Sequence, residues 1–339
     1  MKIVFFGNSY VSAAILEYLI SLKQSACEYR DFEVSSVVTS PPKPAGRGLE
    51  LKENPVKIIA SREGIPAIFE TENLSSDKTL LSGLSDISPD IGVVVSYGKI
   101  IPRKIFSIPG SGSINLHFSL LPHLRGAAPI QWALMRGERK TGVSVFFINE
   151  KLDDGDVLVQ KEVMIEDEDD FFTLREKLIE TGKSALVESL SMFDKGIAFS
   201  SARPQDTLPV FSVDGSIAYA SALKKSDGKI DWSRPASDIR NLIRGLMEWP
   251  VAHTFLPDGK MIKIFKAEVQ KTCPGADGVC PSCRRVSEVT GIARGEGFLV
   301  CCGRDFLKIT EVQPANSRRM SAWAFVVGGG VKVGDRFSH

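Results

Sequence analysis

The sequence predicts an α/β domain with a mostly parallel sheet, followed by a smaller domain that resembles a β-barrel. In roughly the first 200 residues, short apolar segments alternate with segments of helical spacing, which is typical of a parallel sheet covered on both faces. Beyond residue 213, short apolar segments follow one another with turn residues between them, as in small barrels. Residues 197–213 contain two prolines and several small polar residues, and we expect a linker there between domains at 1–196 and 214–339.

The first strand and helix follow directly from local pattern. Lys2–Phe6 is apolar and runs into the turn Gly7-Asn8-Ser9. Apolar residues then recur at helical spacing from Val11 to Leu22, with Ser9 available as the N-cap. The turn lacks the G-x-G-x-x-G pattern, so the sequence gives little support for a nicotinamide or flavin dinucleotide site.

The next strand, Phe32–Thr39, leads into a segment rich in proline and glycine that extends to Pro55. We expect this segment to be an irregular loop. Its basic residues Lys43, Arg47 and Lys52 are open to two interpretations, ordinary solvated charge or a flexible basic finger. The following elements are predicted as a helix at Pro55–Arg62, a strand at Ala67–Phe69, a short helix near Lys78–Leu81 and a buried strand at Ile91–Val95.

Polar chemistry is concentrated between residues 113 and 156. In the predicted strand Ser113–His117, the period of two places Asn115 and His117 on one face near the carboxyl end, where parallel sheets bind ligands. Asp153 follows a predicted strand at Val143–Ile148, in a loop shared with Asp154 and Asp156. Imidazole exchanges protons near neutral pH, an amide can donate to an oxyanion, and a carboxylate can orient the imidazole.

Spacing alone leaves open whether these residues are catalytic or only support the fold. For His123, His253 and His339 we favour a structural role.

Between the two polar segments, a helix is expected from near Ala128, with Pro129 in its first turn. After the second segment we expect a strand at Val157–Met164 and a helix from Phe171 to Phe193; the acidic residues 166–170 then complement the helix dipole and do not form a metal site.

The second domain is predicted to contain a helix and several short strands. Turns at Pro257-Asp258-Gly259 and Gly303-Arg304-Asp305 would join pairs of these strands. The helix is expected at Ser237–Met247 and the strands at Thr254–Leu256, Met261–Ala267, Phe298–Cys302, Phe306–Val312 and Val331–Phe337.

Composition indicates a soluble globular protein of ordinary type, with 43% hydrophobic residues in 339. No apolar run approaches the ~18 residues of a membrane span and no signal or transit peptide is evident, so we expect a cytoplasmic location and no membrane association. Six cysteines indicate no disulfide scaffold. A zinc site at Cys273, Cys280 and Cys283 is disfavoured, because Cys301 and Cys302 would point to opposite faces of a strand.

Charge is unevenly distributed along the chain. Residues 1–211 hold 23 Lys and Arg against 28 Asp and Glu, a net charge of −5. Residues 212–339 hold 19 against 13, a net charge of +6. The basic second part is a candidate for contact with a polyanion such as RNA, although solvated surface charge is an equally open explanation.

The polar segment resembles the folate-dependent formyltransferase family. The family signature combines Asn-x-His, Ser-Leu-Leu-Pro and, about 35 residues further on, Leu-Asp-x-Gly. All three occur here, as Asn115–His117, Ser119–Pro122 and Leu152–Gly155. The resemblance implies that His117 exchanges a proton with support from Asp153, and that Asn115 stabilises the oxyanion of a tetrahedral intermediate. It also implies folate contacts from Ser119, Leu120, Leu121 and Pro122.

The resemblance covers nearly the whole chain and favours the branch of the family that acts on initiator methionyl-tRNA. For that branch it implies a Rossmann-like first domain using 10-formyltetrahydrofolate as cosubstrate, and an OB-like second domain that holds the tRNA acceptor arm. It also implies a role in translation initiation and no metal, and we expect a monomer. Arg47 falls on the family's loop arginine that enters the acceptor end. The matching residues are Lys43–Gly48, Arg125–Ile130, Lys229–Trp232, Trp249-Pro250, Gln313–Ala315 and Met320.

Two departures separate the chain from the usual pattern of this branch. Leu49-Glu50-Leu51 stands where relatives carry lysines, and the segment Cys273–Arg285 is unlike its counterparts. We therefore expect weaker loop contributions to RNA affinity. A purine-pathway formyltransferase would end near residue 200, and an amino-sugar formyltransferase would lack the Pro-Ala-Gly-Arg-Gly loop. A non-catalytic tRNA-binding protein is disfavoured because Asn115, His117 and Asp153 are all present.

Overall fold

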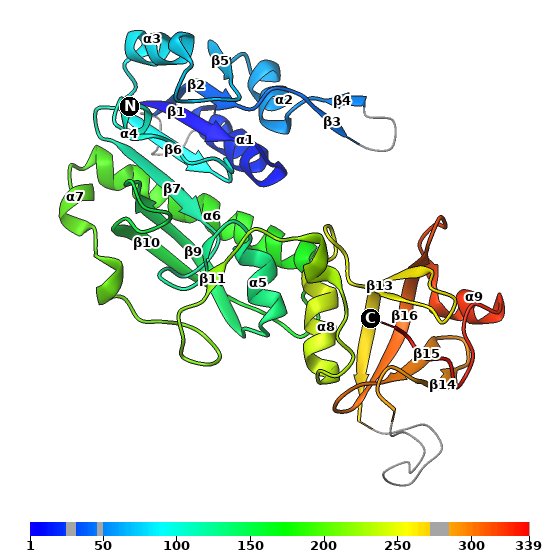
Figure 1. Ribbon diagram of the computed structural model, residues 1–339. Helices are drawn as coiled ribbons and strands as arrows, with labels where there is room; N and C mark the ends of the chain where they lie inside the picture. Colours follow the sequence, from blue (N-terminus) through cyan, green and yellow to red (C-terminus); the bar gives the residue numbers. More distant parts are fainter. Residues whose placement is uncertain (25–31, 46–49, 272–284, 339) are drawn as a thin grey trace. The chain divides into compact units, whose positions relative to one another are not determined.

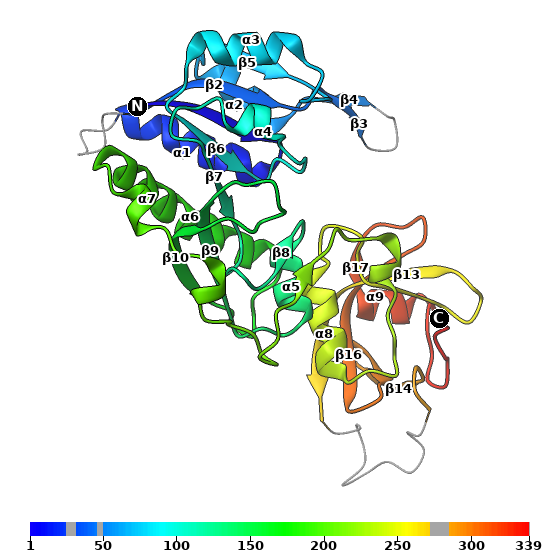
Figure 2. The ribbon, with the colours of Figure 1, turned by 60° about the vertical axis from the view of Figure 1, so that its left-hand side comes forward.

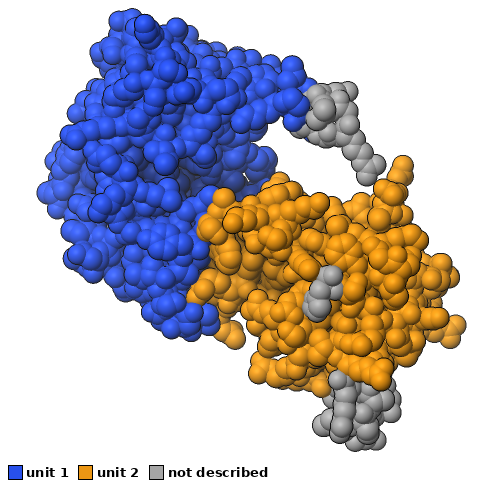
Figure 3. Space-filling model, viewed as in Figure 1, with its two compact units in different colours: residues 1–129, 140–164, 175–220 blue, residues 130–139, 165–174, 221–339 orange. Residues whose placement is uncertain are grey.

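The structure is a computed structural model that describes residues 1–24, 32–45, 50–271 and 285–338 (Figure 1). The chain forms two units, distinguished by colour in Figure 3. The first contains residues 1–129, 140–164 and 175–220, and the second contains residues 130–139, 165–174 and 221–339.

Residues 197–213, expected to form a linker, lie in the first unit. They include the short helix α7 (Ala198–Ser201) and the 3-10 helix η1 (Gln205–Thr207). The domain boundaries expected from the sequence stay a prediction. In the part of the chain that the structure describes, no helix is both long and apolar enough to cross a bilayer.

The first unit is built on a seven-stranded sheet in the order β10-β9-β7-β6-β1-β2-β5. The five strands from β7 to β5 run parallel to one another, whereas β9 is antiparallel to both β7 and β10, which confirms the mostly parallel sheet. The strands are β1 (Lys2–Gly7), β2 (Glu33–Thr39), β5 (Ala67–Glu70), β6 (Ile91–Val95), β7 (Ser113–His117), β9 (Lys140–Phe147) and β10 (Val157–Met164). The strand order reverses between β1 and β6, and ligands bind beside such reversals at the carboxyl ends of strands.

Helices cover both faces of this sheet. On one face, Val4 and Phe6 of β1 pack in a cluster with Leu80 of α3 (Lys78–Ile87) and Ile105 of α4 (Arg103–Phe106). The parallel registers Phe6↔Val94 and Val94↔Asn115 place Asn115 on this same face.

The opposite face of the sheet carries α6 (Phe171–Asp194), where an added Cβ at Gly182 would lie 3.0 Å from Leu116 of β7. Helix α1 (Tyr10–Gln24) lies beside α6, as Figures 1 and 2 both show. The Arg175 guanidinium lies over the Tyr10 ring, 4.4 Å from its centroid. Ser9 caps α1 as expected, because its Oγ accepts a hydrogen bond from the Ser12 amide at 3.2 Å.

The expectation of a wholly irregular loop before Pro55 was wrong at its two ends. β3 (Lys43–Ala45) and β4 (Glu50–Lys52) form an antiparallel pair, with Lys43 opposite Lys52. The two short strands satisfy each other's backbone N–H and C=O groups, and the proline-rich composition of the segment does not reveal this pairing. Helix α2 (Pro55–Arg62) then begins with Asn54 as its N-cap.

The second unit is built on an antiparallel sheet in the order β12-β13-β16-β15-β14, with β17 paired to β16. Its core surrounds Trp232, which is fully buried and stacks on Phe337. Helix α5 (Pro129–Met135) contributes most of its residues to this unit, and α8 (Ala236–Gly245) and α9 (Ala322–Val327) pack with the sheet core. The strands are β12 (His253–Phe255), β13 (Met261–Gln270), β14 (Val289–Ala293), β15 (Gly297–Cys301), β16 (Phe306–Pro314) and β17 (Met320–Ser321). An antiparallel C-terminal β domain is therefore confirmed.

One strand of this domain was predicted in the wrong place. Val331–Phe337 is not a strand; near it only single bridges form, Glu288↔Arg336 and Phe255↔Ser338. The edge strand is instead β14, whose sequence Val-Thr-Gly-Ile-Ala lacks a clear apolar alternation. β14 forms a hairpin with β15, in which Ala293 lies opposite Gly297, and this pairing makes a strand that the local alternation does not signal.

Candidate active site

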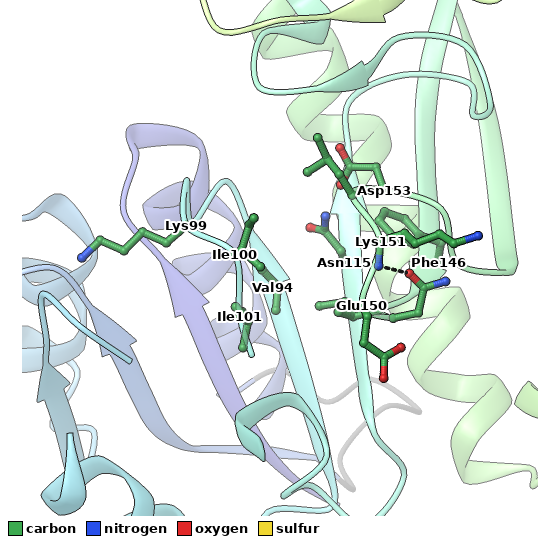
Figure 4. A pocket seen from close by; sticks show the side chains of 12 residues that line it. Val94, Lys99, Ile100, Ile101, Asn115, Phe146, Glu150, Lys151 and Asp153 are labelled. Carbon is green, nitrogen blue, oxygen red and sulfur yellow. Dashed lines mark hydrogen bonds between the residues drawn. The ribbon is translucent and has the colours of Figure 1, made fainter. Parts of the chain in front are cut away.

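Asn115 lies in the middle of three aligned strands at the carboxyl side of the sheet. Its register partners are Val94 of β6 and Phe146 of β9, and all three residues line a pocket (Figure 4). Loops after two of the strands complete the lining, with Lys99–Ile101 following β6 and Asn149–Asp153 following β9. The pocket therefore offers an apolar wall, the Asn115 amide and the Asp153 carboxylate in one place.

His117 is the last residue of β7, and its Nε2 atom is held by a hydrogen bond. Nε2 lies 2.9 Å from the Leu124 carbonyl oxygen, and because a carbonyl only accepts, Nε2 carries the proton. Leu124 adopts φ 59°, a left-handed conformation that turns its carbonyl toward the ring. Nδ1 is then the unprotonated nitrogen of the neutral ring, and it lies 3.8 Å from Asp153 Oδ2.

Asp153 is fixed on the far side of this pair. Its Oδ2 accepts a hydrogen bond from the Gly126 amide at 2.8 Å, and its own φ is 50°. The His117 and Asp153 side chains are 7% and 11% exposed, so their interaction is only partly screened by water. The 3.8 Å gap is too long for a direct hydrogen bond. A proton taken up at Nδ1 would turn the contact into a close ion pair.

A glycine makes the Asp153 loop possible. A Cβ at Gly155 would stand 1.6 Å from the Phe147 carbonyl oxygen, a distance that no side chain can occupy. The Leu-Asp-x-Gly pattern thus has a steric reason, because the loop must pass directly over the end of β9.

The segment Ser119–Pro122 is buried and strongly hydrogen-bonded. Ser144 Oγ accepts from the Leu121 amide at 3.1 Å and donates to the Ser119 carbonyl at 2.7 Å. Gln160 Nε2 donates to the Leu121 carbonyl at 2.8 Å. None of the four residues lines the pocket described above, and their folate contacts stay a prediction.

The structure places Asp153 beside Asn115 in the pocket lining and 3.8 Å from His117, as the sequence led us to expect, and the catalytic roles of the three residues stay a prediction. The sequence analysis missed the pocket loop Lys99–Ile101 and the buried Gln205. The pocket loop had a usable signal, since it follows a buried parallel strand at its carboxyl end. Gln205 had none, because its partners are 50 to 80 residues away in sequence.

Several other residues singled out in the sequence can now be placed. His123 is buried and its Nδ1 accepts from the Ala218 amide at 3.2 Å, and His253 is buried with Nδ1 3.1 Å from the Val251 carbonyl oxygen. Within the described ranges, no group of three or more His, Cys, Asp or Glu side chains is arranged to hold a metal ion. Of the residues singled out in the sequence, the following lie outside the described ranges: Arg47, Leu49, Cys273, Cys280, Cys283 and His339.

The side chains at this edge of the sheet indicate one type of reaction. A doubly wound sheet carries the Asn115 amide and the Asp153 carboxylate at one pocket, with the His117 imidazole 3.8 Å from that carboxylate. This arrangement suits a transfer that passes through an oxyanion and needs a proton acceptor. The formyl transferase model matches residues 1–190, and the model of the formyl transferase C-terminal domain matches residues 222–329. The chain belongs to the formyl transferase family.

Relatives of similar length resemble the whole chain. The methionyl-tRNA formyltransferase of Thermodesulfovibrio yellowstonii is 39% identical over 340 residues, covering 99% of each chain. That of Caldanaerobacter subterraneus subsp. tengcongensis is 35% identical over 338 residues, covering 98% of this chain and 99% of the relative.

Solved structures share the fold at low identity. HypX from Aquifex aeolicus in complex with tetrahydrofolic acid matches with a TM-score of 0.62 and 18% identity over 98% of this chain, which spans 48% of HypX. WlaRD, a sugar 3N-formyl transferase, matches with a TM-score of 0.57 and 16% identity over 94% of this chain and 99% of its own. These likenesses show that the fold of this chain recurs in proteins of low sequence identity.

Proposed function

We propose that this protein is a methionyl-tRNA formyltransferase, which transfers the formyl group of 10-formyltetrahydrofolate to the amino group of methionine on initiator tRNA. The observation that carries the proposal is the similarity over the entire chain to relatives of that name, at 35% and 39% identity. The site adds independent support, because Asn115, His117 and Asp153 offer the donor, the base and the carboxylate that this transfer requires.

The first step is attack of the amine on the formyl carbon. An amine with a pKa near ~8 is largely protonated at pH 7, and it must lose its proton to react. As the new C–N bond forms, the carbonyl π pair moves to oxygen and the amine proton passes to His117 Nδ1, directly or through a water. Nδ1 is suited to this role because Nε2 already donates to the Leu124 carbonyl.

Charge develops at two places in this step, and the site has a group for each. The imidazolium formed at His117 faces the Asp153 carboxylate at 3.8 Å. The Asn115 amide lines the pocket and would donate to the oxyanion. On collapse, the oxygen pair re-forms the carbonyl, the bond from the formyl carbon to the donor nitrogen breaks, and His117 returns its proton to that nitrogen. The products are the formylated amine and tetrahydrofolate.

The C-terminal part of the chain, residues 212–339, would bind the RNA. Residues 212–339 carry a net charge of +6 while residues 1–211 carry −5, which suits a polyanionic substrate held mainly by the C-terminal part. An antiparallel β domain of OB type binds oligonucleotides in other proteins. We infer a monomer that works in the cytoplasm, where its tRNA substrate is used, and sedimentation of the purified protein tests its oligomeric state.

The decisive experiment offers the protein four acceptors with labelled 10-formyltetrahydrofolate: charged initiator tRNA, charged elongator methionine tRNA, a phosphoribosyl amine and an amino sugar. We expect label only on the methionine of initiator tRNA. Affinity for that tRNA should fall linearly in a plot of log K against log salt concentration. Preferential labelling of the amino sugar or the phosphoribosyl amine would overturn the proposal.

A further inference from the structure

A single buried glutamine connects the two loops that fix Asp153. Gln205 is 4% exposed, and its Nε2 donates to the carbonyl oxygens of Asp153 at 2.9 Å and Gly155 at 2.8 Å. Its Oε1 accepts from Arg125 twice, from Nε at 3.0 Å and from Nη2 at 2.7 Å. Both N–H groups and both lone pairs of the amide are therefore used, which is its full hydrogen-bonding capacity.

The partners of Gln205 Nε2 and Oε1 belong to one network of hydrogen bonds and ion pairs around Asp153, called here the Asp153 network. Arg125 forms an ion pair with Asp154 at 2.6 Å, in the same loop as Asp153. Arg125 also precedes Gly126, whose amide donates to Asp153 Oδ2 at 2.8 Å. Gln205 Nε2 thus holds the main chain of Asp153. Gln205 Oε1 holds Arg125, the neighbour of Gly126, whose amide donates to the Asp153 carboxylate.

The backbone of Gln205 is anchored independently of its side chain. Arg203 pairs with Val157 through two backbone hydrogen bonds, at 2.8 and 2.9 Å. Leu208 is buried in a cluster with Leu121, Phe146 and Val157. A substitution at Gln205 should consequently remove its side-chain hydrogen bonds in the Asp153 network, while residues 203–208 stay attached to the unit.

We propose that Gln205 is a positioning residue, which holds Asp153 at the 3.8 Å separation from His117 that formyl transfer uses. The inference rests on the proposed function and deepens it. Gln205 is not itself among the residues that line the pocket, and it acts on the reaction through the position of Asp153, which does line it. An error of ~1 Å in the placement of a catalytic group costs about 10²-fold in rate.

The amide is required on chemical grounds. The substitution Gln205→Glu preserves length and still accepts from Arg125, but its second oxygen would face the Asp153 and Gly155 carbonyls, and acceptors repel one another. Gln205→Met preserves length and removes all four hydrogen bonds. These two variants disturb the loop by different means, so agreement between them would exclude an artefact of one substitution.

The test is a double-mutant cycle on kcat, using Gln205→Met and Asp153→Asn singly and together. We expect Gln205→Met to lower kcat by about 10²-fold, with less than about a 3-fold change in KM for the acceptor and in the dissociation constant of the formyl donor. In the Asp153→Asn background, the same substitution should cost less than about 3-fold, because the carboxylate it positions is already gone. Gln205→Glu should follow the same pattern.

The matched control is Thr207→Ala in the same short helix. Thr207 Oγ1 donates to the Pro204 carbonyl at 2.6 Å and has no part in the Asp153 network, so this variant should keep kcat within about 2-fold of the wild type. Thermal melting of every variant shows whether it is folded.

Equal costs of Gln205→Met in both backgrounds would overturn the proposal, since a merely structural residue weakens the enzyme whatever stands at position 153. Unchanged kcat in both Gln205 variants would overturn it as well. If the wild-type protein labels a different acceptor, the proposed function fails, and the cycle measured with that acceptor still decides the role of Gln205.

Discussion

Replacing Asp153 by asparagine tests the charge relation at the centre of the site. Asparagine has nearly the same shape, and its Oδ1 can still accept the Gly126 amide, which donates to Asp153 Oδ2 at 2.8 Å in the wild type. The loop should keep its path, so the change removes one negative charge 3.8 Å from His117 Nδ1 and little else.

The expected size of the effect follows from that distance. Two unit charges 3.8 Å apart attract by about 4 kcal/mol at an effective dielectric constant of about 20, and by about 1 kcal/mol in bulk water. Side-chain exposures of 7% and 11% favour the upper part of this range. An energy near 3 kcal/mol corresponds to about 10²-fold in rate. We therefore expect kcat to fall by at least about 10²-fold.

The assay is single-turnover transfer of labelled formyl to charged initiator tRNA, with tRNA binding measured separately. Asp156→Asn is the matched control, because Asp156 is exposed and lies in the same loop. It should retain at least half of the wild-type rate. Binding of tRNA should be unchanged in both variants. An Asp153→Asn enzyme with more than a tenth of the wild-type activity would refute the assigned role.

Three further predictions follow from packing and burial. Gly155→Ala should lower kcat at least about 10-fold and destabilise the protein by about 1 to 3 kcal/mol in denaturant unfolding, because its Cβ would stand 1.6 Å from the Phe147 carbonyl oxygen. Trp232→Ala should cost about 3 to 5 kcal/mol of unfolding free energy, because the fully buried indole also donates to Thr254 Oγ1 at 3.1 Å. Burial raises the pKa of the Cys302 thiol from 9.0 to about 12, so the unfolded chain loses this proton first as pH rises. Stability should thus fall above pH 9, by about 1.4 kcal/mol at pH 10, and Cys302→Ala unfolded in parallel should lack this contribution.

Much of the candidate site could be predicted because its signals are local. The period of two in Ser113–His117 places Asn115 and His117 on one face, and the parallel registers confirm that Asn115 shares the face of Val94. The pattern Leu152–Gly155 gave the position of Asp153, and the glycine in it has a steric cause within the loop itself. The alternation of strands and helices limited the possible folds to those with a mostly parallel sheet.

Local patterns in the sequence were enough to predict most of the longer elements, the face that carries the site and the residue types that can do the chemistry. The folded chain was needed to show which nitrogen of His117 is free, because the Leu124 carbonyl that holds Nε2 is turned toward the ring by a left-handed backbone conformation. It alone revealed Gln205, whose partners lie 50 to 80 residues away, and it replaced the expected strand at Val331–Phe337 with β14. For Gln205 the physical reason is distance, because hydrogen bonds between segments 50 to 80 residues apart form only when the chain folds. For His117 and β14 the partners are near in sequence, and the local backbone conformation is what a side-chain pattern does not record.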